Sequence, residues 1–281
     1  MSANVPERPA TAAGDASTTS RRRVPRWWWW SAAVTVLVAG VLLMRLWGNG
    51  GGGSALPSVV ESGAGLLTPG PSPVAGAPIF DASDLDSLFV TPGTLEDTLP
   101  GAADGVEEVG QGAVAAWGLG AGEQVSPASC TVAATVVDGP PAAFDERSWG
   151  NERVVFEQQV TLLESAAAAE QAFRTLVTVV DACPEYLLQG PDGEARVVAS
   201  PAIEDQGFFP SLAQAVDLAA PGDDPQAQLH GHLLVGNVIV TWTASVDAGD
   251  DPARARQQLG SEADLDAMMQ EQARAAASAL P

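Results

Sequence analysis

The two histidines are the first residues whose type and spacing could do chemistry. His230 and His232 lie two positions apart in a segment that alternates in polarity like a strand. Side chains at i and i+2 of a strand point to the same face, so the pair supplies two imidazoles to one surface, which is half of a typical zinc site. The sequence offers no third ligand, and paired histidines on a polar sheet face are more often plain surface residues. We therefore predict no metal site and no cofactor.

The two cysteines are the next candidates. Cys130 and Cys183 are the only ones in the chain, and a redox-active pair would need C-x-x-C spacing. A structural disulfide is the better interpretation. Closing a loop of 53 residues is worth about 4 kcal/mol of stability if the bridge is unstrained.

Motifs for catalysis are absent from the sequence. It contains no G-x-S-x-G, P-loop or H-E-x-x-H pattern and no cysteine nucleophile with a partner. The acid pairs Asp223-Asp224 and Asp250-Asp251 stand beside prolines and lack the spacing of a calcium loop. Carboxylates for a glycosidase are so numerous that their presence is uninformative. We predict no catalytic residues and no enzyme.

A β-hairpin at 226–246 must position the histidines. Gly236-Asn237 suits a two-residue turn, so Gly231 opposes Trp242 and Leu233 opposes Val240. One face of the hairpin is then almost wholly apolar and belongs on the core, where Gly231 leaves room for the indole of Trp242. The other face is polar, with apolar residues only at Leu234 and Ile239, and carries Gln228, His230, His232, Thr241, Thr243 and Ser245.

Other segments supply the rest of the fold. Residues 153–163 alternate as a half-buried strand, and a helix capped by Ser165 runs to about Ala182, bringing Cys183 to its apolar face. Ser261 with Asp264 resembles a capping box that opens a last helix. Shorter elements are expected as capped helices at 83–89 and 91–99 and as strands at 195–200 and 212–219. The fold class is α+β, a twisted mainly antiparallel sheet flanked by helices.

The start of the chain predicts a membrane anchor. Trp27 to Leu46 is apolar and long enough, at about 1.5 Å per residue, to cross the hydrocarbon core. Arginines gather before it, so the N-terminus is expected in the cytoplasm. A cleavable signal peptide would need a shorter core and a small-residue site, and a lipoprotein would need a nearby cysteine. We divide the chain into a disordered tail (1–26), a transmembrane helix (27–47), a Gly/Pro-rich linker (48–79) and an extracytoplasmic domain (80–281).

Charge excludes one class of partner. The chain has a net charge of −22, and the part that follows the anchor holds 33 acidic residues against 7 arginines. Nucleic acids and anionic lipids are bound through basic residues, so we predict no nucleic-acid partner. The acidic surplus is either a solubilising surface or a surface for cationic ligands.

Several of these features together are similar to a known family. They are a short N-terminal helix, Cys130 followed by Trp149, the strand Val154-Val-Phe-Glu-Gln-Gln-Val, the alanine-rich helix that ends at Cys183, and the Gly236-Asn237 hairpin before a terminal helix. In this order they resemble the PknH-like extracellular sensor domain of actinobacteria, here as a stand-alone anchored member. The resemblance implies a twisted antiparallel sheet, open on one side as a cleft for an unidentified ligand. Members often carry a second disulfide on the late hairpin, which would fall on Gln228 and Ser245; these are directly opposed in the predicted register.

Two functions follow as hypotheses. The first is a non-catalytic sensor that binds a small-molecule or cell-envelope ligand and signals through a separate protein. Its cleft would be lined by His230, His232, Thr241, Thr243, Glu157 and Gln159. The alternative is an envelope interaction or scaffold protein without a small ligand. A pocket over the polar sheet face would favour the first, and a flat closed sheet with an exposed apolar patch the second.

Overall fold

The computed structural model describes residues 76–281 except 110–115, 192, 223 and 247–251. The predicted tail, the predicted membrane helix and the linker up to residue 75 lie outside these residues. Within the described part, no helix has the length and apolar character needed to cross a bilayer.

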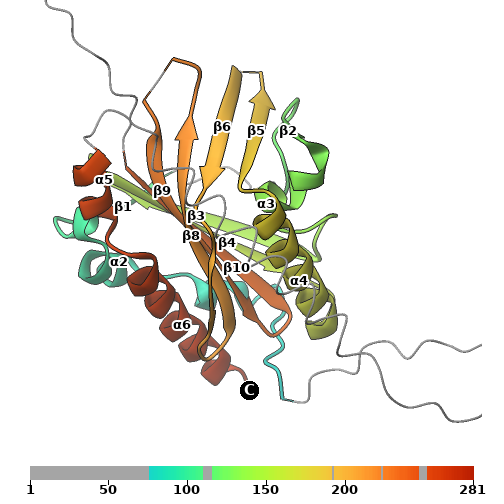
Figure 1. Cartoon of the computed structure of the whole chain (residues 1–281). Coiled ribbons are helices and arrows are strands. Elements are labelled where there is room, and N and C mark those ends of the chain that lie inside the picture. The colour runs from blue at the N-terminus through green and yellow to red at the C-terminus, as the bar shows by residue number, and fades with distance from the viewer. Residues whose placement is uncertain (1–75, 110–115, 192, 223, 247–251) are drawn as a thin grey trace, which may run out of the picture. The chain divides into compact units, whose positions relative to one another are not determined.

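One twisted antiparallel sheet dominates the described residues (Figure 1). Its order is β1-β3-β4-β10-β9-β8-β6-β5-β2, with β7 paired to β8. The strands are β1 (Glu107–Val109), β2 (Gln124–Ser126), β3 (Ala143–Gly150), β4 (Val154–Leu162), β5 (Glu185–Gly190), β6 (Gly193–Ala199), β7 (Ile203–Gln206), β8 (Pro210–Ala219), β9 (Gln226–Val235) and β10 (Val238–Val246). The predicted α+β class with a mainly antiparallel sheet is confirmed.

Helices lie on both faces of the sheet (Figure 1). They are η1 (Leu85–Leu88), α2 (Pro92–Thr98), η2 (Pro100–Ala102), η3 (Ala128–Cys130), α3 (Thr131–Thr135), α4 (Ala166–Ala182), α5 (Pro252–Leu259) and α6 (Glu262–Ala279). α2, α5 and α6 cover one face, and α3 and α4 lie on the other. The first face carries the larger core, which includes Phe156, Leu233, Val240, Trp242 and Met269.

The β9–β10 hairpin has the predicted register. Gly231 pairs with Trp242 and Ser245 with Gln228, and Gly236 has the positive φ of 61° that a two-residue turn needs. The turn also holds the start of the domain, because the Asn237 amide donates to Phe80 O at 2.9 Å and accepts from Phe80 N at 2.8 Å.

Three of the four predicted helix caps form. Thr91, Ser165 and Ser261 accept hydrogen bonds from the backbone N–H three residues later. The predicted cap at Ser83 is wrong, since the short helix η1 begins after Asp84 with no side-chain cap. The Ser83 hydroxyl instead donates to the Asp81 carboxylate at 2.5 Å. Serine side chains often form such local hydrogen bonds in place of a helix cap.

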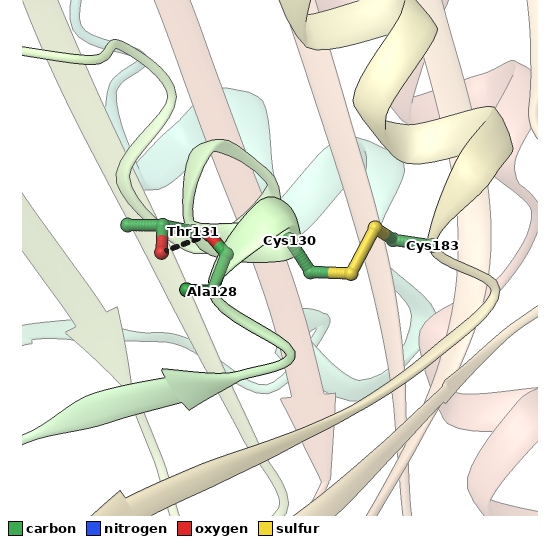
Figure 2. The surroundings of a disulfide bond; sticks show 4 residues. All are labelled: Ala128, Cys130, Thr131 and Cys183. Carbon is green, nitrogen blue, oxygen red and sulfur yellow. Dashed lines mark hydrogen bonds between the residues drawn. A yellow bond between two sulfur atoms is a disulfide. The ribbon is translucent and has the colours of Figure 1, made fainter.

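The predicted disulfide is present (Figure 2). Cys130 ends η3 and Cys183 follows α4, with their Cα atoms 5.7 Å apart. Both cysteines are buried in a small cluster with Tyr186, Val197 and Val216, from β5, β6 and β8. The bridge thus links the end of α4 to η3, the short helix that follows β2.

Gly231→Ala tests how tightly the hairpin packs. A Cβ on Gly231 would stand 2.2 Å from the Trp242 ring, and overpacking a filled core costs about 1–3 kcal/mol. We expect a loss of that size in the free energy of unfolding measured with urea. Gly139→Ala is the control because a Cβ there meets nothing within 4 Å. Equal stability of the two variants would show that the indole can move aside.

Cys130→Ser combined with Cys183→Ser tests the bridge. The bridge joins cysteines that are 53 residues apart. Removing it should lower the free energy of unfolding by about 4 kcal/mol, because the unfolded chain gains conformational entropy. The measurement is urea unfolding of the double variant and of the parent chain under non-reducing conditions. Free thiols in parent protein recovered from cells would contradict the prediction.

Candidate functional site

The candidate site is a polar floor formed by two rows of side chains on the sheet face that carries α4. β10 pairs with β4 and β9, so Thr241 lies between Gln159 and His232, and Thr243 lies between Glu157 and His230. Strand pairing thus brings together all six side chains that the sequence predicted for a cleft: His230, His232, Thr241, Thr243, Glu157 and Gln159. Whether they bind a ligand stays a prediction.

The centre of the polar floor is closed. His232 and Thr241 are 3% and 8% exposed, and His232 Nδ1 lies 2.9 Å from Thr241 Oγ1. Burial, with the nearby His230, lowers the pKa of His232 to about 3, so its imidazole is neutral at pH 7. This pair is a satisfied buried network rather than a ligand-facing surface.

The adjoining row is more open. Glu157, Thr243 and His230 are half-buried, and His230 Nε2 lies 3.0 Å from Gln228 Oε1. Burial also lowers the pKa of His230, so this ring is neutral as well. Of the six predicted side chains, these three and Gln159, which is also half-buried, are the ones that solvent or a ligand can reach.

Two carboxyls meet at one end of the polar floor. Glu146 on β3 accepts a hydrogen bond from Gln159 at 2.9 Å and lies diagonally across from Glu157. Burial, the charge of Glu146 and a hydrogen bond between the two groups raise the pKa of Glu157 to about 7. Near neutral pH Glu157 is therefore protonated in part of the molecules and can donate a hydrogen bond to Glu146.

Sequence reasoning missed two members of the polar floor. Glu146 lies on β3, which the sequence analysis did not predict, and Gln214 lies opposite His230 on β8. Gln214 is 8% exposed, and its buried Oε1 has no hydrogen-bond partner among the described residues. Residues 143–150 show no alternation of apolar and polar side chains that could have indicated the strand that carries Glu146.

Helix α4 covers only the apolar end of this face. Its Phe173 and Leu176 pack with Ile239 near the hairpin turn and with Leu212 on β8. Four cavities in the described region, of about 470, 590, 600 and 120 Å³, are lined by residues other than the six predicted ones. The polar floor is thus a half-covered surface, and none of these four cavities lies over it.

Metal binding has no support from the described residues. Among them, no three side chains of His, Cys, Asp or Glu are grouped so that they could hold an ion. The polar floor instead offers hydrogen-bonding groups of several kinds, namely carboxyl, amide, hydroxyl and neutral imidazole. These groups can donate hydrogen bonds to a polar molecule or accept them from it.

The described residues form a fold of the α+β class. It is an α+β domain with one long antiparallel sheet, helices on both faces and a central hairpin. No family model matches the chain, and no curated protein matches it.

Solved structures do resemble it. The extracellular domain of PknH from Mycobacterium tuberculosis superposes with a TM-score of 0.51 at 13% identity, covering 71% of this chain and 100% of that domain. A putative uncharacterized protein from Mycobacterium smegmatis, an Rv0999 ortholog, gives a TM-score of 0.32 at 16% identity over 58% of this chain and 88% of its own. That second likeness is too weak to support an argument. The first confirms the fold that the resemblance implied.

Glu157→Gln tests the carboxyl pair. In the folded parent chain the pKa of Glu157 is about 7, above the ordinary 4.5. The native state therefore binds this proton more tightly than the unfolded chain does, and the stability of the parent falls as pH rises from 4.5 to 7. A neutral glutamine avoids this loss. We expect the variant to be more stable than the parent by about 1–2 kcal/mol at pH 8, allowing for partial solvent screening, and no more stable near pH 4.

The measurement is urea unfolding across pH 4–8, and the difference between variant and parent isolates this group from other titrations. Glu152→Gln, at an exposed position, removes the same charge and should show no such pH-dependent difference. A constant offset at all pH values would mean that Glu157 does not hold a proton near neutrality.

Proposed function

We propose that this chain is a non-catalytic sensor-type domain that binds a small polar ligand on the polar floor. The observation that carries the proposal is the convergence, over four neighbouring strands, of Glu146, Gln159, Glu157, Thr243 and His230 around a half-open surface. None of the four cavities lies over this surface, so the proposal rests on the grouping of these side chains and not on a pocket. The shared fold with the extracellular domain of PknH supports the sensor-type part of this proposal and not the ligand or its site.

The proposal places the domain outside the cytoplasm. The disulfide between Cys130 and Cys183 supports this, because such bridges persist in oxidising compartments. The arginine-flanked apolar segment 27–46 would be the anchor. A ligand bound outside would then act through a separate signalling protein, which we propose as the partner.

A thermal-shift screen tests ligand binding. The full-length chain in phosphatidylcholine nanodiscs is heated with cell-envelope fragments, small metabolites, polyamines and divalent ions. A ligand at 100 times its dissociation constant stabilises the folded state by about 2.7 kcal/mol, so a binder gives a visible shift. We expect at least one polar compound to raise the melting temperature of the parent chain.

Variants locate the site of any hit. Thr243→Val keeps the shape of a half-buried side chain but removes its hydroxyl, and it should weaken the hit several-fold. Thr178→Val makes the same change on an exposed position of α4 and should leave binding unchanged. A hit that Thr243→Val does not affect, or no hit in the whole panel, would contradict binding on the polar floor.

A further inference from the structure

A cavity lies on the opposite face of the sheet from the polar floor. It has a volume of about 470 Å³ and is enclosed by β7, β8 and the first turns of α6. Ser211 and Ala213 of β8 line it, and they pair with Leu233 and Gly231 of the apolar face, whereas Leu212 and Gln214 point to the other side. Its volume is that of a pocket for a small organic molecule.

Part of the cavity wall is apolar and open to solvent. Ile203 and Phe208 are each 61% exposed, which is high for large apolar side chains. Small residues Ala213, Ala263 and Ala267 complete this wall. An apolar group that entered here would remove both large side chains from water.

The inner part of the cavity holds a buried carboxyl. Asp266 is 8% exposed, and its Oδ2 accepts a hydrogen bond from Ser211 Oγ at 3.0 Å. Its other oxygen, Oδ1, is buried with no hydrogen-bond partner among the described residues. Burial raises the pKa of Asp266; hydrogen bonds from Ser211 and Gln270 oppose this effect, and the charge of Asp205 adds to it. A buried carboxyl oxygen without a donor is unfavourable, so the site would gain from a ligand that supplies one.

Charge around the cavity selects the kind of donor. None of the residues that line the cavity is basic, and four of them are acidic: Asp205, Glu262, Asp266 and Glu271. A cation lies at the rim, where Arg274 is 4.7 Å from the centre of the Phe208 ring and pairs with Glu271. The cavity therefore has a negative potential that favours a cation over a neutral or anionic donor.

We propose that this cavity is a second binding site, which takes a small organic amine with an apolar body. The ammonium group would donate to Asp266 Oδ1 within the acidic part, and the body would lie between Phe208, Ile203 and the alanines of α6. Arg274 would remain at the rim, so the ligand must be short. This site is independent of the polar floor, because the two lie on opposite faces of the sheet.

Binding of 2-phenylethylamine tests the proposal. The full-length chain in phosphatidylcholine nanodiscs is titrated calorimetrically with this amine, with neutral 2-phenylethanol and with anionic 3-phenylpropionate, and empty nanodiscs serve as the blank. We expect one amine per chain, bound about 10- to 100-fold more tightly than the alcohol, since a hydrogen bond between charged groups is worth that factor. The carboxylate should bind most weakly.

Two variants assign the site. Asp266→Asn should weaken the amine at least about ten-fold while leaving the alcohol unchanged. Ala267→Phe fills the cavity from an exposed position of α6 and should abolish binding of both compounds, which keeps the test decisive if Asp266→Asn fails to fold. Asp181→Asn removes a matched charge from the exposed end of α4 and should have no effect.

Three outcomes would overturn the proposal. The first is equal affinity for the amine and the alcohol, which would mean that the cavity recognises only apolar groups. The second is amine binding that neither Asp266→Asn nor Ala267→Phe weakens. The third is self-association of the parent chain in sedimentation that Ala267→Phe abolishes, without amine binding, which would make the apolar wall a contact between two copies.

Discussion

The rest of the domain depends on the register of the β9–β10 hairpin. Its two-residue turn at Gly236 and Asn237 fixes which residues oppose one another, and the period of two then assigns every side chain of both strands to a face. A slip of one residue would place Trp242 on the polar face and the histidines in the core. The contact of Trp242 with Gly231 opposes such a slip, because only a residue without a side chain leaves space for the ring.

The two faces of the sheet are stabilised in different ways. The face under α2, α5 and α6 is a continuous apolar core, and its contribution is mainly the burial of hydrocarbon. The other face has an apolar end packed against α4 and a polar end whose side chains pair across strands, as His232 does with Thr241. Pairing offsets the desolvation of these groups but adds little beyond it. The disulfide limits how far α4 can move from this less densely apolar face.

This asymmetry bears on function. The polar floor has capacity for further hydrogen bonds, because the buried Gln214 Oε1 has no partner among the described residues and the Glu146–Glu157 pair is half-buried. The same is true of Asp266 in the cavity on the other face. In both places the proposed ligands would complete hydrogen bonds that the described residues leave open. The strongly acidic surface makes a cationic or neutral ligand the electrostatically favoured choice at either site.

Local patterns in the sequence were sufficient for most of the central elements. Alternation and a turn dipeptide predicted the hairpin and its register, β4 followed from its period of two, and the serines at 165 and 261 marked the starts of α4 and α6. These features rest on interactions between residues close in the chain, so they can be read without the fold. The six side chains of the predicted cleft could also be assigned to faces, since facing depends only on parity within a strand.

Apart from the β9–β10 pair, no local pattern contained the neighbour of each strand, and none contained the depth of each side chain. The sheet order placed β3 beside β4 and so brought Glu146 to Glu157, and packing buried His232 and Thr241, which the sequence suggested as ligand contacts. Likewise, the cavity at Asp266 exists only because α6 packs near β7 and β8, segments that end more than 40 residues before α6 begins. Contacts between distant segments depend on how whole elements pack, and this information is spread over the entire core rather than held in any one stretch.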